Sequence, residues 1–399
     1  MKYGSDQTVA RDLNVEMVLQ LLKEKHMSSS DLAKRMHLSK PGLTKIMNEM
    51  IENHLVVFTE EEHLLKNNVG RKKTLYKINP NAGMVGVINF APTHVKIVFS
   101  DLEGGTIDEV DIPNQEFIDE KTLNEITQTI DLLRSKHESN QRALLSVCIA
   151  APGKINSSTQ EIFQSPKFKP AQHIKLKDYF KKHLNVHVSL KNDINLWLLG
   201  EREQGYIDSS IEDAILVHID TGIGGAILNK GKIVEGEQGF AGEFGLMKTF
   251  DRFGNIVYYD SICSTNSIKN QIAYYKTIGE ITNIKDGFRT SDVIEAFEQQ
   301  DPLVQTVVIE SAKNIGILIS NLYNVFDCKH IYISGRVRGF KDKYLDEVKL
   351  FLGKQSSEIE LKYATCGDEA ISFGARSVAI DQAFKVLIEN RKRGNGNKN

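Results

Sequence analysis

The stretch that decides the fold is Val186–Glu203, VHVSLKNDINLWLLGERE. Val186–Val188 predicts a short strand, and Ile194–Glu203 predicts a helix with apolar residues along it. Asn192 and Asp193 lie between the two. Open α/β sheets bind ligands at the carboxyl ends of their strands, so an amide and a carboxylate at this junction are placed to bind a hydroxyl. The alternative is that one of the two residues only caps the helix.

The composition is that of a globular protein with two or three domains. The chain has 399 residues, 41% of them hydrophobic and 26% charged, with a net charge of -2. A net charge this close to zero excludes a protein that binds nucleic acid through a large overall positive charge. The charge is uneven, because residues 1–82 contain 13 Lys and Arg against 10 Asp and Glu, whereas the remainder contains 37 against 42. The first segment is therefore slightly positive and the remainder slightly negative, as expected of a DNA-binding head on an acidic body.

The four cysteines are far apart in the sequence. None forms a CxxC pair, which argues against a disulfide scaffold or a cysteine-rich zinc site; they are Cys148, Cys263, Cys328 and Cys366. The first residues have no apolar core of a signal peptide, and no apolar run approaches the roughly 20 residues of a membrane span. We therefore expect a cytoplasmic protein with no membrane partner.

Residues 1–82 predict a winged helix-turn-helix. Apolar residues recur at helical spacing in three segments, and the third carries the clearest amphipathic stripe, Leu43, Ile46, Met47, Met50 and Ile51. Ser39 or Lys40 is the expected cap, with Pro41 in the first turn. The opposite face is short, polar and basic, as a major-groove reader requires. Its candidate DNA-binding residues are Ser39, Lys40, Gly42, Thr44, Lys45 and Asn48.

A basic loop follows the third helix. Strands are expected at Leu55–Phe58 and Thr74–Ile78, and the loop between them contains Gly70, Arg71 and Lys72. As a wing, this loop would place Arg71 in a minor groove and Lys72 on phosphate. The alternative is a small helical domain that binds protein, with a solvated basic loop.

The body, after a linker at residues 79–82, repeats one plan twice. Strands are expected at Met84–Phe90, Val95–Ser100 and Thr106–Ile112, then a helix around Lys121–Lys136 and a strand at Leu144–Ala150. The second half has a strand at Ala214–Ile219, a glycine turn at Asp220–Gly225, a returning strand at Ala226–Leu228 and, after a long helix, a strand at His330–Ser334. Hairpins followed by βα units, occurring twice, indicate two similar α/β lobes around a cleft.

The body resembles the ROK family (repressor, ORF, kinase), whose fold is the actin-like, ribonuclease-H-like fold. The resemblance rests on the motifs Asn192–Asn195 with Gly200-Glu201, Thr221–Gly225 and Gly239–Gly245. A winged head on such a body is similar to the sugar-responsive repressor branch, which includes xylose and N-acetylglucosamine regulators. The resemblance implies a head at 1–82, a first lobe at 83–205, a second lobe at 206–374, a helix at 375–390 that packs back on the first lobe, and a disordered tail at 391–399.

Two departures from the family pattern decide which branch the chain resembles. The Asp-x-Gly-Gly-Thr phosphate loop of the kinases corresponds to Asn89–Thr93, where the acidic residue and both glycines are absent. A second Gly-Gly pair, which approaches the nucleotide in the kinases, corresponds to Gly335-Arg336, so its second glycine is absent too. A phosphate cradle needs free backbone N–H groups and little side-chain bulk, so we expect neither ATP binding nor phosphotransfer. The zinc-binding His and Cys positions of the family fall on Leu246, Asp251, Phe253 and Tyr258, so no metal or cofactor is expected.

The sugar contacts of the family carry over in part. They fall on Asn192, Asp193, Glu243, Leu246 and Asp260, of which all but Leu246 remain polar. Asp193 would be a vestigial catalytic base, and Asn192, Asp193, Glu243 and Asp260 are the expected effector-binding residues.

Three hypotheses follow from the sequence. The first is a sugar-responsive repressor that is not an enzyme and that binds double-stranded operator DNA as a homodimer or homotetramer. The second is an ATP-dependent sugar kinase with an attached head, and the third is a ligand-independent scaffold.

Overall fold

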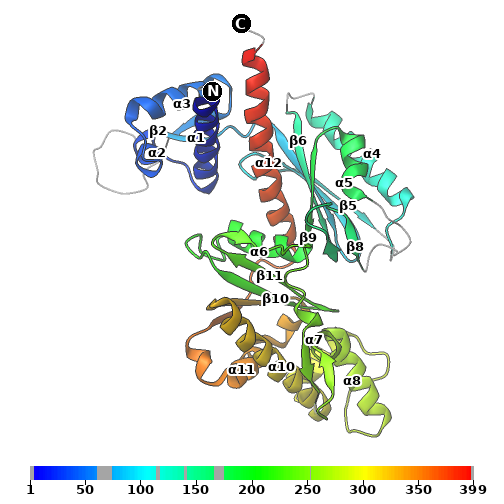
Figure 1. The fold of residues 1–399 in the computed structure, drawn as a ribbon. Helices are drawn as coiled ribbons and strands as arrows, with labels where there is room; N and C mark the ends of the chain where they lie inside the picture. Colours follow the sequence, from blue (N-terminus) through cyan, green and yellow to red (C-terminus); the bar gives the residue numbers. More distant parts are fainter. Residues whose placement is uncertain are drawn as a thin grey trace. The chain divides into compact units, whose positions relative to one another are not determined.

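The structure is a computed structural model, and it describes residues 4–60, 74–113, 117–138, 142–165, 175–251 and 253–396. The chain forms two compact units (Figure 1). Unit 1 comprises Met1–Ala151, Ser165–Lys191 and Ala375–Asn399, and unit 2 comprises Pro152–Gln164 and Asn192–Gly374.

The head of unit 1 consists of helices followed by a two-stranded antiparallel sheet. The helices are α1 (Gly4–Glu24), α2 (Ser29–Arg35) and α3 (Lys40–Glu52), and the strands are β1 (Val56–Glu60) and β2 (Thr74–Ile78). Ser39 is the N-cap of α3, because its side chain accepts a hydrogen bond from the Gly42 N–H at 3.3 Å. Of the two predicted cap residues, Ser39 is therefore the correct one.

The rest of unit 1 is built on a mixed sheet with the strand order β5-β4-β3-β6-β9. Its elements are β3 (Met84–Phe90), β4 (His94–Asp101), β5 (Thr106–Pro113), α4 (Glu120–Glu138), β6 (Leu144–Ala151), α5 (Leu176–Leu184) and β9 (His187–Asn192). Every residue of β3 and β6 is buried, and the two strands run parallel. These continuous apolar runs are what a strand covered on both faces requires.

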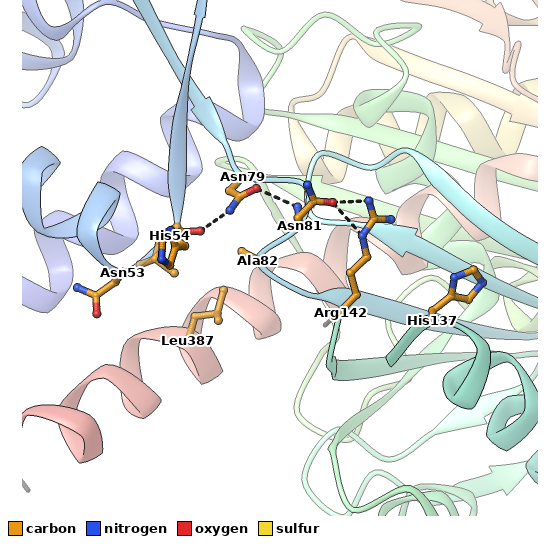
Figure 2. A pocket seen from close by; sticks show the side chains of 9 residues that line it. Asn53, His54, Asn79, Asn81, Ala82, His137, Arg142 and Leu387 are labelled. Atoms are coloured by element: carbon orange, nitrogen blue, oxygen red, sulfur yellow. Dashed lines mark hydrogen bonds between the residues drawn. The ribbon is translucent and has the colours of Figure 1, made fainter. Parts of the chain in front are cut away.

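The linker between head and sheet is held by side-chain amides. Asn79 Nδ2 donates to the His54 carbonyl at 2.7 Å, and Arg142 Nε donates to Asn81 Oδ1 at 2.9 Å (Figure 2). A cavity of about 790 Å³ lies beside these bonds, with Leu387 in its wall. None of the residues predicted to bind DNA or an effector lines this cavity, so it does not mark either predicted site.

Helix α12 (Glu369–Gly396) packs on both the head and the sheet of unit 1. The Ser146 hydroxyl on β6 donates to the Ala379 carbonyl at 2.6 Å. On the head, Lys23 Nζ pairs with Asp381 at 2.8 Å, and Arg391 pairs with Asp12 at 2.5 Å and Glu49 at 2.9 Å. The disordered tail predicted from Arg391 is therefore wrong up to residue 396, since α12 continues to Gly396 and Arg391 itself forms these ion pairs.

Unit 2 has a second sheet, with the strand order β12-β11-β10-β15-β16. Its strands are β10 (Ala214–Ile219), β11 (Ile223–Asn229), β12 (Lys232–Ile233), β15 (His330–Ser334) and β16 (Glu360–Tyr363). The helices are α6 (Asp193–Glu203), α7 (Tyr259–Cys263), α8 (Thr265–Thr277), α9 (Thr290–Glu298), α10 (Pro302–Phe326) and α11 (Lys341–Leu352). Two hairpins complete it, β7 (Lys154–Ile155) with β8 (Ile162–Gln164), and β13 (Lys248–Phe250) with β14 (Ile256–Tyr258).

Helix α10 forms the centre of the unit 2 core. Its 25 residues include an 18-residue window that is apolar enough to cross a membrane by length and composition, and 61% of that window is buried inside the protein. The expectation that no apolar segment reaches this length was therefore wrong. The buried side chains of α10 pack with those of β10, β15 and α11 in one apolar cluster, which accounts for the hydrophobicity of the helix.

The strand expected at Val186–Val188 is β9, which runs from His187 to Asn192 and so includes Asn192. Two further predicted boundaries differ from the structure. The glycine turn was expected to end at Gly225, but β11 already begins at Ile223, so Gly224 and Gly225 lie within the strand. A Cβ at Gly225 would lie 2.1 Å from the Phe244 ring, and this ring occupies the space that a side chain would need. The second difference is that α6, expected in the first lobe, belongs to the compact unit that contains residues 206–374.

Helix α6 crosses the beginning of α12 with backbone against backbone. A Cβ at Gly200 would lie 1.9 Å from the Ala370 carbonyl oxygen, and one at Gly374 would lie 1.9 Å from that of Leu196. The buried carboxylate of Glu201 accepts the backbone N–H groups of Thr365 and Cys366 at 3.0 and 2.9 Å. Gly200-Glu201 thus fixes α6 to the segment from which α12 begins.

Substitution of Gly200 tests this contact. We expect Gly200→Ala to lower the free energy of unfolding by about 1–3 kcal/mol, because the added methyl group must force two backbones apart. The gain in helix propensity, about 1 kcal/mol, is too small to offset this clash. Urea denaturation of the full chain measures the effect, with Glu203→Ala on the exposed side of α6 as the control. Equal stability of Gly200→Ala and the wild type would contradict the close contact.

Substitution of Arg391 tests the contact between head and α12. Its side chain is 6% exposed, and those of Asp12 and Glu49 are 13% and 11% exposed. Removing one partner of a buried ion pair leaves an uncompensated charge, so we expect Arg391→Met to destabilise unit 1 by roughly 3 kcal/mol. Amide hydrogen exchange in α1 should accelerate. The control is Lys354→Met at an exposed site of unit 2, and unchanged exchange in the Arg391 variant would show that the ion pairs do not hold the head.

Candidate functional site

Asn192 has two roles at the junction of β9 and α6. Its Oδ1 accepts hydrogen bonds from the backbone N–H groups of Ile194 at 2.9 Å and Asn195 at 3.0 Å, so Asn192 is the N-cap of α6. Its Nδ2 donates to the carbonyl of Gly153 at 3.0 Å. The capping alternative is therefore correct for Asn192, and the same amide also fixes the β7–β8 hairpin beside the first turn of α6.

The glycines of Gly239–Gly245 let this loop approach two other backbone segments. A Cβ at Gly239 would lie 2.1 Å from the Ile155 carbonyl oxygen in β7, and a Cβ at Gly242 would lie 2.2 Å from the Gly225 carbonyl oxygen in β11. Both glycines have positive φ, 83° and 92°, which other residues rarely adopt. The loop therefore lies against β7 and against β11, and Glu243 directly follows the second of these contacts.

Asp260 is held by the first residue of β11. It lies in the first turn of α7, and its Oδ1 accepts the Ile223 N–H at 2.7 Å. Its negative charge raises the pKa of Glu243. The charge of Glu243 in turn raises the pKa of Asp193. Glu243 thus lies within electrostatic reach of both Asp193 and Asp260 in unit 2.

Burial is the main cause of the shifted acidities. Burial raises the pKa of Asp193 from 3.8 to about 6, although hydrogen bonds from the backbone oppose this rise. Burial also raises the pKa of Glu243, and the positive charge of Lys154 opposes that rise. Buried carboxyl groups with a raised pKa are candidates for a functional site.

The sequence analysis missed three side chains at this site. Lys154 Nζ lies 5.7 Å from the ring centroid of Phe240, within cation–π range. The ring of Phe163 in β8 lies 5.7 Å from that of Phe240. No pattern signalled a hairpin at residues 154–164, because its strands are too short for a periodicity to show, so these residues could not be assigned to the site.

The residues predicted to bind DNA have the expected exposure where the structure describes them. Ser39, Lys40, Gly42, Thr44, Lys45 and Asn48 are all exposed, whereas Leu43, Ile46, Met47 and Met50 are buried. The Thr44 hydroxyl donates to the Lys40 carbonyl at 2.8 Å. Gly70, Arg71 and Lys72 lie outside the described residues, so their part in DNA binding stays a prediction.

Comparison with known proteins identifies the family of the chain. The pattern of the ROK family matches residues 85–382, which is most of the chain. This chain belongs to the ROK family. The family match begins at β3, so the three head helices and the β1–β2 hairpin lie outside it.

The ROK relatives of this chain include repressors and kinases. The xylose repressor of Caldicellulosiruptor bescii is 23% identical over 398 residues, covering 94% of this chain and 96% of that protein. The glucokinase of Halalkalibacterium halodurans is 26% identical over 301 residues, covering 71% and 91%. A crystal structure of a ROK family transcriptional regulator, a homolog of the E. coli MLC protein, has a TM-score of 0.79 at 21% identity and covers 95% of this chain and 99% of its own. That likeness shows the fold, a mixed α/β ROK body.

The residues at the ROK nucleotide positions do not fit ATP. Asn89 and Phe90 are buried in β3, and the turn that follows contains Pro92, which has no N–H group to donate to a phosphate. At the later glycine pair, the guanidinium of Arg336 forms an ion pair with Asp220 at 2.5 Å. The side chain of Arg336 therefore binds the end of β10, beside the glycine turn that the kinases of the family use for phosphate.

The residues at the ROK zinc positions do not fit a metal. Leu246 is 49% exposed, and Phe253 and Tyr258 also lie largely in solvent. The carboxylate of Asp251 accepts the backbone N–H groups of Phe253 and Asn255 at 2.9 and 2.8 Å, which closes the β13–β14 turn. Among the described residues, no group of three His, Cys, Asp or Glu side chains could hold a metal ion. In this chain, hydrogen bonds within the β13–β14 turn hold the hairpin at the positions where other family members bind zinc.

The pKa of Asp193 predicts a pH dependence of stability. Because the pKa of Asp193 is higher in the folded chain, about 6 against 3.8, the folded state holds this proton up to a higher pH than the unfolded state. The protonated carboxyl group of Asp193 therefore favours the folded state, and this contribution is fully present below about pH 4 and is lost as the pH rises through 6. At 1.36 kcal/mol per pKa unit, the free energy of unfolding should fall by roughly 3 kcal/mol over this range. We expect Asp193→Asn to remove this loss.

The measurement is the free energy of unfolding between pH 4 and 7. The control is Asp208→Asn, because the Ser210 side chain and backbone lower the pKa of exposed Asp208, so this variant cannot remove a loss of the same sign. A decline that persists in Asp193→Asn would show that Asp193 is not the group that titrates.

Proposed function

We propose that this chain is a sugar-responsive transcriptional repressor of carbohydrate uptake or catabolism genes. In this proposal, α1–α3 with β1 and β2 form a winged helix-turn-helix that binds double-stranded operator DNA, and the actin-like ROK body binds a sugar effector. The observation that supports it is the head itself. It lies before the family match, and the alignment with a xylose repressor covers 94% of this chain, against 71% for a glucokinase.

The reading face of α3 supports the DNA-binding half of the proposal. An apolar stripe fixes the helix on the head, and the opposite face carries Lys40, Lys45 and Asn48 toward solvent. Amides and short polar side chains read base edges, and lysines neutralise phosphates. A helix that only packed against protein would not need this exposed basic and polar face.

The residues gathered near Glu243 support the effector half. A carboxylate is an acceptor for sugar hydroxyls, and an amide such as Asn192 supplies both a donor and an acceptor. Asn192, Asp193, Glu243 and Asp260 are all in unit 2, and the charge of Glu243 acts on Asp193 while that of Asp260 acts on Glu243, which supports grouping them in one site. We propose that a sugar binds here and that the chain has no catalytic activity, since the nucleotide positions do not fit ATP.

The remaining parts of the proposal concern assembly and location. We propose a homodimer or homotetramer, because operators with two half-sites are bound by symmetric proteins. We also propose a cytoplasmic location, where operator DNA and imported sugar are both present. The division into a head at 1–82, two lobes and a returning helix remains the domain organisation that we propose.

The first test is binding to the DNA upstream of the protein's own gene at several salt concentrations. We expect sequence-specific binding that weakens steeply with salt. Lys45→Ala should weaken binding to all sequences alike and reduce the salt slope by about one, because one phosphate contact is lost. The matched control is Lys354→Ala, which makes the same charge change on unit 2. Binding without sequence preference or salt dependence would reject the DNA-binding role.

The second test concerns the response to sugar. Glu243→Gln keeps the shape of the side chain and removes its charge, so we expect it to lose the effect of sugar on operator binding, with at least a tenfold loss of sugar affinity. Its operator affinity without sugar should equal that of the wild type. If Lys45→Ala and Glu243→Gln each lose both functions equally, the division into a reading head and an effector body is wrong.

The retained Asp193 and the similarity to a glucokinase favour one alternative, an ATP-dependent sugar kinase. Asp193 would then remove a proton from the sugar hydroxyl. ATP turnover with a panel of hexoses, lost in Asp193→Asn, would establish the kinase. No turnover and no nucleotide binding would exclude it.

A further inference from the structure

The β7–β8 hairpin forms a wall beside the acidic residues of unit 2. Asn192 Nδ2 holds the Gly153 carbonyl at 3.0 Å, and the Ser157 hydroxyl donates to the Glu237 carbonyl at 3.1 Å. The close approach of Gly239 to Ile155 adds a third attachment. The hairpin, α6 and the loop with Glu243 belong to one compact unit, so the position of Lys154 relative to Glu243 is fixed within that unit.

Lys154 presents an ammonium group with free hydrogen-bond donors. Within the described part of the chain, its Nζ makes no hydrogen bond or ion pair, and its one recorded partner is the Phe240 ring, 5.7 Å away. The carboxylate of Glu243 likewise accepts no hydrogen bond from the residues described. Yet Lys154 is close enough for its charge to act on Glu243. Among the described residues, an ammonium donor and a carboxylate acceptor thus lie within electrostatic reach of each other, and neither is used in a hydrogen bond.

Two aromatic rings add an apolar surface to this wall. Phe163 is 75% exposed, and its ring lies 5.7 Å from that of half-buried Phe240. Sugar rings carry C–H groups on their faces and hydroxyls at their edges. An aromatic surface beside a carboxylate, an amide and an ammonium group therefore matches both parts of a sugar.

The charges of the site limit which sugars it accepts. Glu243 lies within electrostatic reach of two other acids, Asp193 and Asp260, and of the ammonium group of Lys154. A sugar with a carboxylate or a phosphate would add a further negative charge to these acids, and like charges in a partly buried site repel one another strongly. An uncharged sugar meets no such cost.

We propose that Lys154 is a specificity-determining residue of the effector site, and that it donates to a hydroxyl of an uncharged sugar whose neighbouring hydroxyl donates to Glu243. This inference rests on the proposed sugar-binding function. Lys154 supplies, from the β7–β8 hairpin, the donor that position 246 cannot supply, because Leu246 has no polar atom on its side chain. Sugar acids and sugar phosphates are excluded.

The experiment compares matched sugars on the full-length protein by titration calorimetry at constant ionic strength. The uncharged probes are D-xylose, D-glucose and N-acetyl-D-glucosamine, and the charged probes are D-glucuronate, D-glucose 6-phosphate and N-acetyl-D-glucosamine 6-phosphate. We expect at least one uncharged sugar to bind, and its charged counterparts to bind at least tenfold more weakly. Lys154→Met should weaken the uncharged sugar at least tenfold, and Lys154→Arg should restore part of the loss.

The control is Lys232→Met, which removes the same charge from an exposed site on β12, and it should bind sugar as the wild type does. Equal thermal denaturation of Lys154→Met and the wild type without sugar establishes that the variant is folded. The pH dependence of binding should also move, because loss of the Lys154 charge raises the pKa of Glu243 further.

Three results would overturn the inference, and only the third would also reject the proposed sugar-binding function. Tighter binding of a charged sugar than of its uncharged counterpart overturns the exclusion of anions. Unchanged binding in Lys154→Met, together with lost binding in Glu243→Gln, overturns the role of Lys154 and leaves the proposed function intact. Failure of every probe to bind a wild-type protein that still binds its operator rejects this inference and the effector half of the proposed function together.

Discussion

The side-chain amide of Asn192 is the constraint on which the site depends. One oxygen accepts two backbone N–H groups and begins α6, and the nitrogen of the same group holds the Gly153 carbonyl. A carboxylate at this position could cap the helix but could not donate to Gly153. A single residue therefore orients Asp193, which follows it, and fixes the hairpin that carries Lys154. The choice of amide and not acid is explained by this double role.

The contacts at the two ends of α12 extend this constraint along the chain. At its first turn, α12 meets the backbone of α6 at Gly200, and Glu201 holds the residues just before it. Farther along, Asp381 and Arg391 hold α1, and Arg391 also pairs with Glu49 on the buried side of α3. One continuous helix thus contacts both the helix that begins at Asp193 and the helix that carries the proposed reading face.

The sequence predicted the regular parts of this fold, because their patterns are local. The stripe of α3, its cap at Ser39 and the buried strands β3, β6 and β10 all follow from apolar periodicity and capping chemistry. It failed where distant residues decide the structure. The sequence alone predicts a turn at Gly225, whereas in the structure the Phe244 ring occupies the space where a side chain would lie. The sequence also predicts a disordered tail, whereas Arg391 forms ion pairs with Asp12 and Glu49. Lys154 was missed for the same reason, since only its contact with Phe240 brings it to the acidic residues.

The departures from the ROK pattern form a consistent set once their new contacts are considered. Arg336 neutralises Asp220 where the kinases of the family need an open phosphate site, and Asp251 closes a turn where family members use metal. At these two positions an interaction within the chain thus stands where the family pattern has a glycine or a zinc ligand. Asp193 and Glu243 differ from these residues, because burial raises the pKa of both carboxyl groups, and the backbone bonds to Asp193 and the charge of Lys154 only oppose that rise. Buried carboxyl groups with a raised pKa are more common at functional sites than elsewhere in a fold, which is why the proposed effector site is centred on them.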